Sequence, residues 1–229
     1  MTSQKSLDNP ADNAIILVNK ARTWTSFDVV NKLRYGLKVK KVGHAGTLDP
    51  LATGLLVVCT GKKTKQIQEI QDAAKEYTGI ISLGAVTESY DLETPLIQKG
   101  NCLTLNESVI IATAEHFKGT IEQTPPAYSA VKVSGKRAYE LARKGIEPKL
   151  SSRKVEVLEF EITAIQLPDV GFRIVCSKGT YIRSIANDFG SKLNVGGHLK
   201  SLCRTRIGDY LLEDAKTVEE CIAEYSKVL

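Results

Sequence analysis

The chain has 229 residues and a net charge of +5, and with 42% hydrophobic and 25% charged residues its composition excludes a disordered, collagen-like or coiled-coil protein. Its longest apolar runs, at residues 15–18 and 55–59, are far shorter than the roughly 20 residues that cross a bilayer, and its start has no signal core, so we expect a cytoplasmic protein without a membrane span. The five cysteines form no C-x-x-C pair and the three histidines lie far apart, which predicts neither disulfides nor a metal site.

The first half of the chain is predicted to mix helices with strand. Hydrophobic residues spaced three or four apart predict a helix over residues 26–37, with Ser26 as its N-cap. The same spacing predicts a helix over residues 64–74, and the run that follows, KEYTGIISLG at residues 75–84, has the composition of a strand. A further helix is expected over residues 106–118.

A basic segment comes next. Between Lys132 and Lys154 eight basic residues accompany two acidic ones, giving +6, whereas the rest of the chain sums to −1. Two adjacent prolines before it exclude a helix at its start, and only residues 137–144 have a helical pattern. We predict a basic insertion at about residues 124–152. Its charge suits either a surface that binds nucleic-acid phosphates or an ordinary solvated loop and helix.

The second half is predicted to contain two strands and two helices. The runs RKVEVLEFEIT and VGFRIVCS, residues 153–163 and 170–177, have strand composition, and the alternation slips after Val157, which predicts a bulge. A regular apolar stripe predicts a helix over residues 182–193. A T-x-x-E capping box, Thr217 to Glu220, predicts the start of a last helix. This order of elements favours an α+β fold in a single domain over residues 1–229.

The densest group of turn-forming residues is KVGHAGTLDPLATGLLVVCTGKKTK, residues 41–65. Its glycines allow a tight backbone, and Pro50 restrains Asp49 to an extended conformation, so a stiff loop presents this carboxylate. An aspartate between such residues is most often a turn former or helix cap, and these residues alone leave both roles open. Gly54 stands seven positions before Gly61, whereas a P-loop needs five, which excludes that nucleotide site.

Within this segment, GHAGTLDPLATGLL resembles the active-site motif of the tRNA pseudouridine synthase B family. Further segments are similar to family segments, in the family's order: KEYTG at 75–79, QTPPAYSAVKVSGKRAYELAR at 123–143, SKGTYIRSIANDFG at 177–190 and LCRTRIGDYLLEDA at 202–215. Several motifs in register from Ala14 to Ala215 identify the chain as a member of this family.

The resemblance implies a pseudouridine synthase core, an α+β fold whose mixed, mostly antiparallel sheet is flanked by helices and loops. It implies that the chain converts a uridine of the tRNA T-arm, position 55, to pseudouridine after flipping the nucleotide out of the RNA. Since this isomerisation neither gains nor loses atoms, no cofactor is expected. The implied partner is the T-arm stem-loop of tRNA; no protein partner is implied, and we expect a monomer.

The family's motifs also assign roles to residues. Asp49 matches the catalytic aspartate, Tyr77 the tyrosine packed against the target base, and Arg183 the arginine paired with the aspartate. His44 matches the histidine that enters the T-loop in place of the flipped base. The remaining matches line the uridine pocket or are basic positions near the site: Tyr181, Leu202, Lys20 and Lys65. Taken singly, these tyrosines, this histidine and this arginine have plainer explanations in packing, loop hydrogen bonds and solvent exposure.

The resemblance gives the basic insertion a purpose as a clamp on the folded RNA. The predicted RNA-binding residues are Lys132, Lys136, Arg137, Arg143 and Lys144. Two alternatives stay open: a non-catalytic RNA-binding or RNA-folding module, and a synthase for another RNA, such as ribosomal RNA or a guide-RNA complex. The residues also leave open whether Asp49 attacks C1′, adds to the uracil ring or removes a sugar proton to give a glycal, the route that the family favours.

The chain departs from the family's pattern in three places. Asn19, Lys20 and Ala21 replace the family's D-K-P, so the loop that enters the first helix is expected to be less rigid. TESYD replaces T-D-T-x-D, keeping Asp91, and we expect that loop to be variable. Only fourteen residues follow Ala215, so we expect no C-terminal PUA domain.

Overall fold

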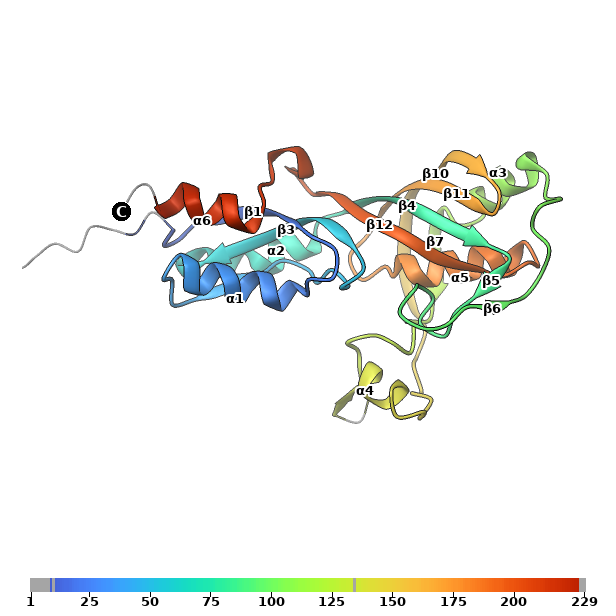
Figure 1. The fold of residues 1–229 in the computed structure, drawn as a ribbon, viewed down its shortest axis with the longest axis horizontal. Helices are drawn as coiled ribbons and strands as arrows, with labels where there is room; N and C mark the ends of the chain where they lie inside the picture. Colours follow the sequence, from blue (N-terminus) through green and yellow to red (C-terminus); the bar gives the residue numbers. More distant parts are fainter. Residues whose placement is uncertain (1–8, 10, 134, 227–229) are drawn as a thin grey trace, which may run out of the picture. The chain divides into compact units, whose positions relative to one another are not determined.

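The computed structural model describes residue 9, residues 11–133 and residues 135–226. The chain divides into two compact units, which are described separately (Figure 1). The first unit consists of residues 1–75 and 203–229, and the second of residues 76–202. None of the helices in the described part is both long enough and apolar enough to cross a membrane.

The first unit is built on a sheet around the strand β3 (Thr53–Thr60). Both β1 (Ile15–Lys20) and β2 (Val42–His44) pair with β3 in antiparallel register. The last residues of β12 (Gly197–Ile207) run parallel to β3 and pair with β13 (Tyr210–Leu211). The helices of this unit are α1 (Ser26–Gly36), α2 (Ile67–Asp72) and α6 (Val218–Ser226), with 3₁₀ turns η1 (Gly61–Gln66) and η2 (Leu212–Asp214).

Strand β3 is buried on both faces, which explains its unbroken apolar run. Leu56 and Val58 join a cluster that includes residues of α1 and α6. Leu55 and Val57 point the other way, into a cluster with Ile70 of α2. Because side chains alternate along a strand, both faces need hydrophobic residues. The loop that carries Asp49 joins β2 to this buried strand.

The second unit contains the larger part of the sheet, in the order β12, β4, β11, β10 and β7. Helices α3 and α5 supply residues to its core, where four phenylalanines contact one another: Phe117, Phe160, Phe172 and Phe189. The bounds of these elements are β4 (Lys75–Leu83), α3 (Glu107–Glu115), β7 (Gly119–Gln123), β10 (Arg153–Gln166), β11 (Asp169–Cys176) and α5 (Ile182–Lys192).

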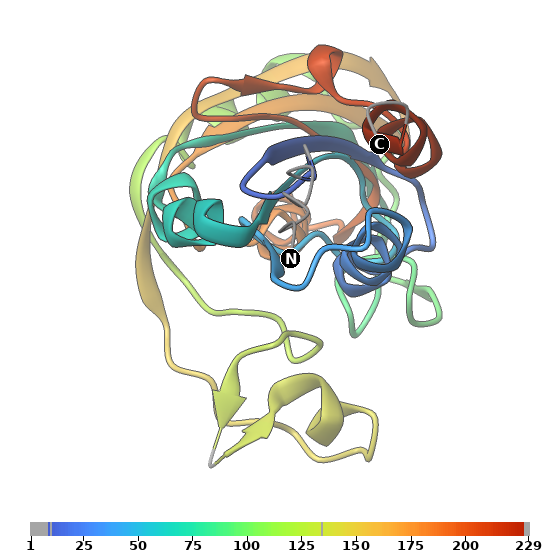
Figure 2. The same cartoon turned by 90° about the vertical axis from the view of Figure 1, so that its left-hand side faces the viewer.

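Short elements of the second unit lie in the loops. A small ribbon is formed by β5 (Ala85–Val86) and β6 (Ile97–Gln98). The basic insertion contains a second ribbon and a short helix: β8 (Lys132–Val133), β9 (Lys136–Arg137) and α4 (Ala138–Ala142). In both views the segment with α4 projects away from the sheet of its own unit (Figures 1 and 2).

The α+β fold and its mostly antiparallel sheet are confirmed. The bulge is confirmed as well, because the register of β10 against β11 shifts between Val157 and Glu159. The capping box at Thr217 is confirmed by the hydrogen bonds that Thr217 and Glu220 exchange. The helix expected at 64–74 is partly wrong: residues 61–66 form a 3₁₀ turn, and α2 covers only Ile67–Asp72.

The N-cap of α1 is Thr25, and the prediction of Ser26 is wrong. The Thr25 hydroxyl accepts a hydrogen bond from the Asp28 amide at 3.0 Å, and the Asp28 carboxylate accepts one from the Thr25 amide at 2.9 Å. Either hydroxyl can cap a helix, but here the reciprocal bonds with Asp28 form at Thr25. The Ser26 hydroxyl is thereby left for another partner, in the loop of Asp49.

Candidate active site

The loop between β2 and β3 is held from inside the first unit. Ser26 is buried; its hydroxyl accepts a hydrogen bond from the Leu48 amide at 2.9 Å and donates one to the Leu48 carbonyl at 3.2 Å. The Asp49 carbonyl accepts a hydrogen bond from the Ala52 amide, and the Pro50 carbonyl accepts one from the Thr23 amide. The backbone is therefore fixed immediately before and after Asp49, whose side chain is half-buried.

Lys20 supports the same loop from the end of β1. Its side chain is fully buried, and its ammonium group donates to the carbonyls of Ala21, Trp24 and Pro50, at 3.0, 2.7 and 3.4 Å. Burial lowers the pKa of Lys20 to about 8; the negative charge of Asp49 acts against this shift, and the positive charge of Arg204 adds to it. These three charged groups therefore interact within the first unit.

Sequence analysis missed Arg204, which reaches the loop from β12. Its side chain is only 1% exposed, and its guanidinium donates to the carbonyls of Leu55 at 2.8 Å, Gly46 at 3.0 Å and Thr47 at 3.5 Å. Together with Ser26 and Lys20, it completes the support of residues 46–50. An arginine in a strand pattern gives no sign of burial, because only the folded loop supplies the carbonyls that bind it.

Two further predicted residues of the first unit flank this loop. His44 ends β2. Burial lowers the pKa of His44; a backbone hydrogen bond with Gly46 acts against this shift, and the nearby Arg204 guanidinium adds to it, so the neutral imidazole is favoured. Lys65 lies on η1 with an exposed side chain.

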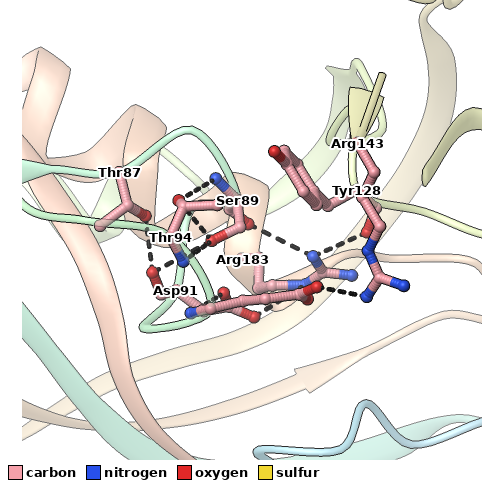
Figure 3. Close-up of polar contacts among 8 residues, drawn as sticks. Thr87, Ser89, Asp91, Thr94, Tyr128, Arg143 and Arg183 are labelled. Atoms are coloured by element: carbon pink, nitrogen blue, oxygen red, sulfur yellow. Dashed lines mark hydrogen bonds and ion pairs between the residues drawn. The ribbon is translucent and has the colours of Figure 1, made fainter. Parts of the chain in front are cut away.

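Arg183 lies in the second unit, near the start of α5, and is 4% exposed rather than facing water (Figure 3). One terminal nitrogen, Nη1, donates to the carbonyls of Tyr128 at 2.9 Å and Ser89 at 3.3 Å. Its Nε atom lies 3.7 Å from Oδ2 of Asp91, which is also buried. The guanidinium thus connects α5 to the loop of Asp91 and to the start of the basic insertion.

The loop that contains Asp91, which departs from the family's pattern, is held by its own hydrogen bonds. The Asp91 carboxylate accepts a hydrogen bond from the Glu93 amide, and its carbonyl accepts one from the Thr87 hydroxyl at 2.6 Å (Figure 3). Ser89 and Thr94 exchange three further hydrogen bonds across the loop. Sequence analysis gave Asp91 no role; the structure makes it the buried carboxylate that faces Arg183.

The predicted pocket residues of the second unit differ in their surroundings. Tyr77 on β4 and Leu202 on β12 are partly buried against the core that also contains the start of α5. Tyr181 precedes α5, where Gln123 binds both its amide, at 2.7 Å, and its carbonyl, at 3.1 Å. The guanidinium of Arg153 lies 5.0 Å from the centre of its ring, which is cation–π distance.

All five predicted RNA-binding residues are exposed, but their neighbours differ. Lys132 and Arg137 pair across the β8–β9 ribbon. Arg143 contacts Glu93 at 2.6 Å and lies over the Tyr139 ring, which ties the insertion to the Asp91 loop. Among residues that the structure describes, the other four have no acidic group within 4.0 Å. The insertion therefore offers unneutralised positive charge to solvent.

The predicted residues thus fall into two groups, one in each unit. Asp49, Lys20, His44 and Lys65 belong to the first unit, while Tyr77, Tyr181, Arg183 and Leu202 belong to the second. Chemically, the first group offers a carboxylate on a fixed backbone, and the second offers aromatic and aliphatic side chains and a buried guanidinium. The pairing of Asp49 with Arg183 stays a prediction.

The comparisons with known proteins agree on one family. Residues 34–182 match the model described as TruB family pseudouridylate synthase, N-terminal domain. The "tRNA pseudouridine synthase B" of Flavobacterium johnsoniae is 53% identical over 211 residues, which cover 89% of this chain and 92% of that protein. The protein of the same name from Phocaeicola vulgatus is 48% identical over 217 residues, covering 92% of each chain.

Solved structures agree with the fold. A chain in the crystal structure of a Cbf5-Nop10-Gar1 complex superposes with a TM-score of 0.74 at 31% identity, over 94% of this chain and 55% of that chain. A chain in an H/ACA RNP bound to a substrate RNA containing 2′-deoxyuridine superposes with a TM-score of 0.69 at 29% identity, over 92% and 53%. The present chain spans about half the length of these solved chains.

Proposed function

Because the chain belongs to the TruB family of pseudouridylate synthases, we propose that it isomerises uridine to pseudouridine at position 55 in the T-arm of tRNA. The observation that carries the proposal is the identity of 53% to a tRNA pseudouridine synthase B over nearly the whole of both chains. The proposed enzyme is a cytoplasmic monomer with one catalytic domain.

The reaction keeps every atom of its substrate. The N1–C1′ bond of the uridine breaks, the uracil turns, and C5 of the same ring bonds to C1′; the proton of C5 leaves and N1 gains one. Neither electrons nor atoms are exchanged with another molecule, so the stoichiometry requires no redox cofactor or energy source. What the protein must supply is a group that acts on the sugar and a site that holds the freed ring.

In this proposal Asp49 acts in its ionised form. The carboxylate removes the C2′ proton of the ribose while uracil leaves with the electron pair of the N1–C1′ bond, and a glycal results. As C5 bonds to C1′, Asp49 returns the same proton to C2′, where the electron pair of the glycal double bond forms the new C–H bond. Support for this role comes from the loop, whose backbone is fixed from Gly46 to Pro50. Arg183 is proposed to pair with Asp49 and favour the charged form.

The target base has to leave the RNA stack, which costs a few kcal/mol. We assign Tyr77, Tyr181 and Leu202 to the pocket that receives it, and His44 to the space that it vacates in the T-loop. Lys65 is assigned to nearby phosphates, and Lys20 to support of the Asp49 loop. The exposed charges of the insertion are assigned to capture of the RNA: Lys132, Lys136, Arg137, Arg143 and Lys144.

The test is to map pseudouridine at single-nucleotide resolution after incubating the purified chain with unmodified tRNA, with an isolated T-arm hairpin and with ribosomal RNA fragments. We expect one modified uridine, in the T-arm, in both the tRNA and the hairpin. The matched control is Asp49→Asn. Absence of pseudouridine with the wild-type chain would favour a non-catalytic RNA-binding module, and modification of only the ribosomal fragments would assign another substrate.

A further inference from the structure

Two fully buried cations lie under the Asp49 loop without an ion-pair partner among the described residues. Lys20 is 0% exposed and Arg204 1%, and both donate their hydrogen bonds to backbone carbonyls. Burying a charge costs several kcal/mol unless other charges or dipoles compensate it. Because neutral side chains could fill the same space, packing alone does not explain why both of these buried side chains carry a positive charge.

The carbonyls that these cations bind lie on both sides of Asp49. Arg204 binds those of Gly46 and Thr47, before the aspartate, and Lys20 binds that of Pro50, directly after it. Arg204 also binds the Leu55 carbonyl at 2.8 Å, which ties the loop to the buried strand β3. The backbone on each side of Asp49 is therefore bound by a buried cation, and no step of the proposed reaction yet uses Arg204.

Backbone geometry brings Arg204 to this place. In the parallel pairing of β12 with β3, Arg204 lies opposite Gly54, whose φ of +99° favours glycine. A side chain at Gly54 would overlap the backbone oxygen of Arg204 and lie 2.8 Å from the Cys203 sulfur. This glycine of the active-site motif therefore permits the close approach by which the guanidinium reaches the loop.

We propose that Arg204 is a positioning residue for the reaction: its forked donors fix the loop of Asp49, and its positive charge, with that of Lys20, favours the ionised carboxylate. This inference rests on the proposed role of Asp49. The charged or titratable groups that interact here are Asp49, Lys20, Arg204, His44 and Asp28. Removing one cation makes proton uptake by Asp49 easier, so the acid limb of the rate profile moves to higher pH.

The experiment compares Arg204→Gln and Arg204→Lys with wild type in single-turnover rates from pH 5 to pH 9 and in tRNA affinity. For Arg204→Gln we expect a loss of about 10²-fold in rate at pH 7, an acid limb at higher pH and a dissociation constant within about threefold of wild type. For Arg204→Lys, which keeps the charge but not the forked donors, we expect a loss of about tenfold with the acid limb unmoved. The control Lys200→Gln removes an exposed cation from the same strand and should behave as wild type.

A second readout does not depend on turnover. Because the Arg204 charge lowers the pKa of His44, Arg204→Gln should raise it in an NMR titration of the protein without RNA, and the Lys200→Gln control should leave it unchanged. A wild-type rate and an unmoved acid limb in both Arg204 variants would overturn the inference. If Arg204→Gln does not fold, an Arg204→Lys rate equal to wild type overturns the positioning role. If the wild-type chain is inactive, the proposed function is rejected. The change in the His44 pKa then still tests whether the Arg204 charge acts at this loop.

Discussion

The loop of Asp49 and the basic insertion differ in how their backbones are held. Around Asp49, buried side chains bind the carbonyls of Gly46, Thr47, Leu48 and Pro50. The insertion projects from its unit (Figure 2), and contacts such as that of Arg143 with Glu93 tie it to the Asp91 loop. Catalysis depends on fixed geometry, whereas phosphates attract charge over longer distances and tolerate motion. If the two regions have their proposed roles, chemistry and RNA capture should be separable.

The largest effect is expected from Arg183→Gln, which removes the cation that faces the buried Asp91 carboxylate. Leaving a buried charge without its partner costs about 3 kcal/mol, so the free energy of unfolding should fall by that amount. Turnover should fall by about 10²-fold or more, because the proposed partner of Asp49 is lost. Denaturant unfolding and tritium release measure the two effects.

The matched control is Lys192→Gln, which removes an exposed cation from the other end of α5. It should leave both the free energy of unfolding and the turnover rate unchanged. Equal stability of Arg183→Gln and wild type would mean that Arg183 and Asp91 do not form a stabilising pair.

A smaller, different effect is expected when the insertion's charge is reversed. Changing Lys136, Arg137, Arg143 and Lys144 to Glu should raise the apparent KM for tRNA by about tenfold or more and flatten its salt dependence, since fewer counterions are released. The rate at saturating tRNA should change little, because the Asp49 loop is untouched. Steady-state kinetics at several salt concentrations measure both.

Reversing four exposed lysines on other surfaces of the second unit controls for net charge: Lys99, Lys118, Lys192 and Lys200. If this control raises KM equally, the effect belongs to overall charge. An unchanged salt slope in the fourfold variant would contradict the role of the insertion as a clamp.

The smallest effects are expected from neighbouring hydroxyls at the start of α1. Ser26→Ala removes two hydrogen bonds to Leu48 and should lower the turnover rate several-fold. Thr25→Ala removes the helix cap and should lower the free energy of unfolding by about 1 kcal/mol with the rate unchanged. Thermal unfolding and single-turnover rates separate these effects, and equal rates in the two variants would refute the positioning role of Ser26.

Sequence patterns correctly predicted those elements that depend on interactions between residues a few positions apart. The apolar stripe of α5, the strand β4, the bulge after Val157 and the capping box at Thr217 depend on spacings of a few residues, and all are confirmed. The expected helix over 64–74 is shorter than its pattern, because residues 61–66 form a tighter 3₁₀ turn. The helix expected over 106–118 is α3, which ends earlier, at Glu115, because residues 116–118 form a closing turn.

Groups that depend on tertiary contacts were not predicted. Both Ser26 and Thr25 can cap a helix, but the reciprocal bonds with Asp28 form at Thr25, and the Ser26 hydroxyl binds the Leu48 backbone instead. Arg204 is buried because carbonyls distant in sequence surround it, and Asp91 matters because Arg183 lies beside it. Such residues carry no periodic signal, since the partners that satisfy them lie well beyond one helical turn, from 22 positions away for Ser26 and Leu48 to 158 for Arg204 and Gly46.

The separation of chemistry from capture is tested most directly by measuring the single-turnover rate and the tRNA dissociation constant side by side for Asp49→Asn and for the fourfold insertion variant. The account predicts that Asp49→Asn forms no detectable pseudouridine while binding tRNA within a few-fold of wild type, and that the insertion variant shows the reverse pattern. Measurable turnover in Asp49→Asn would contradict the account.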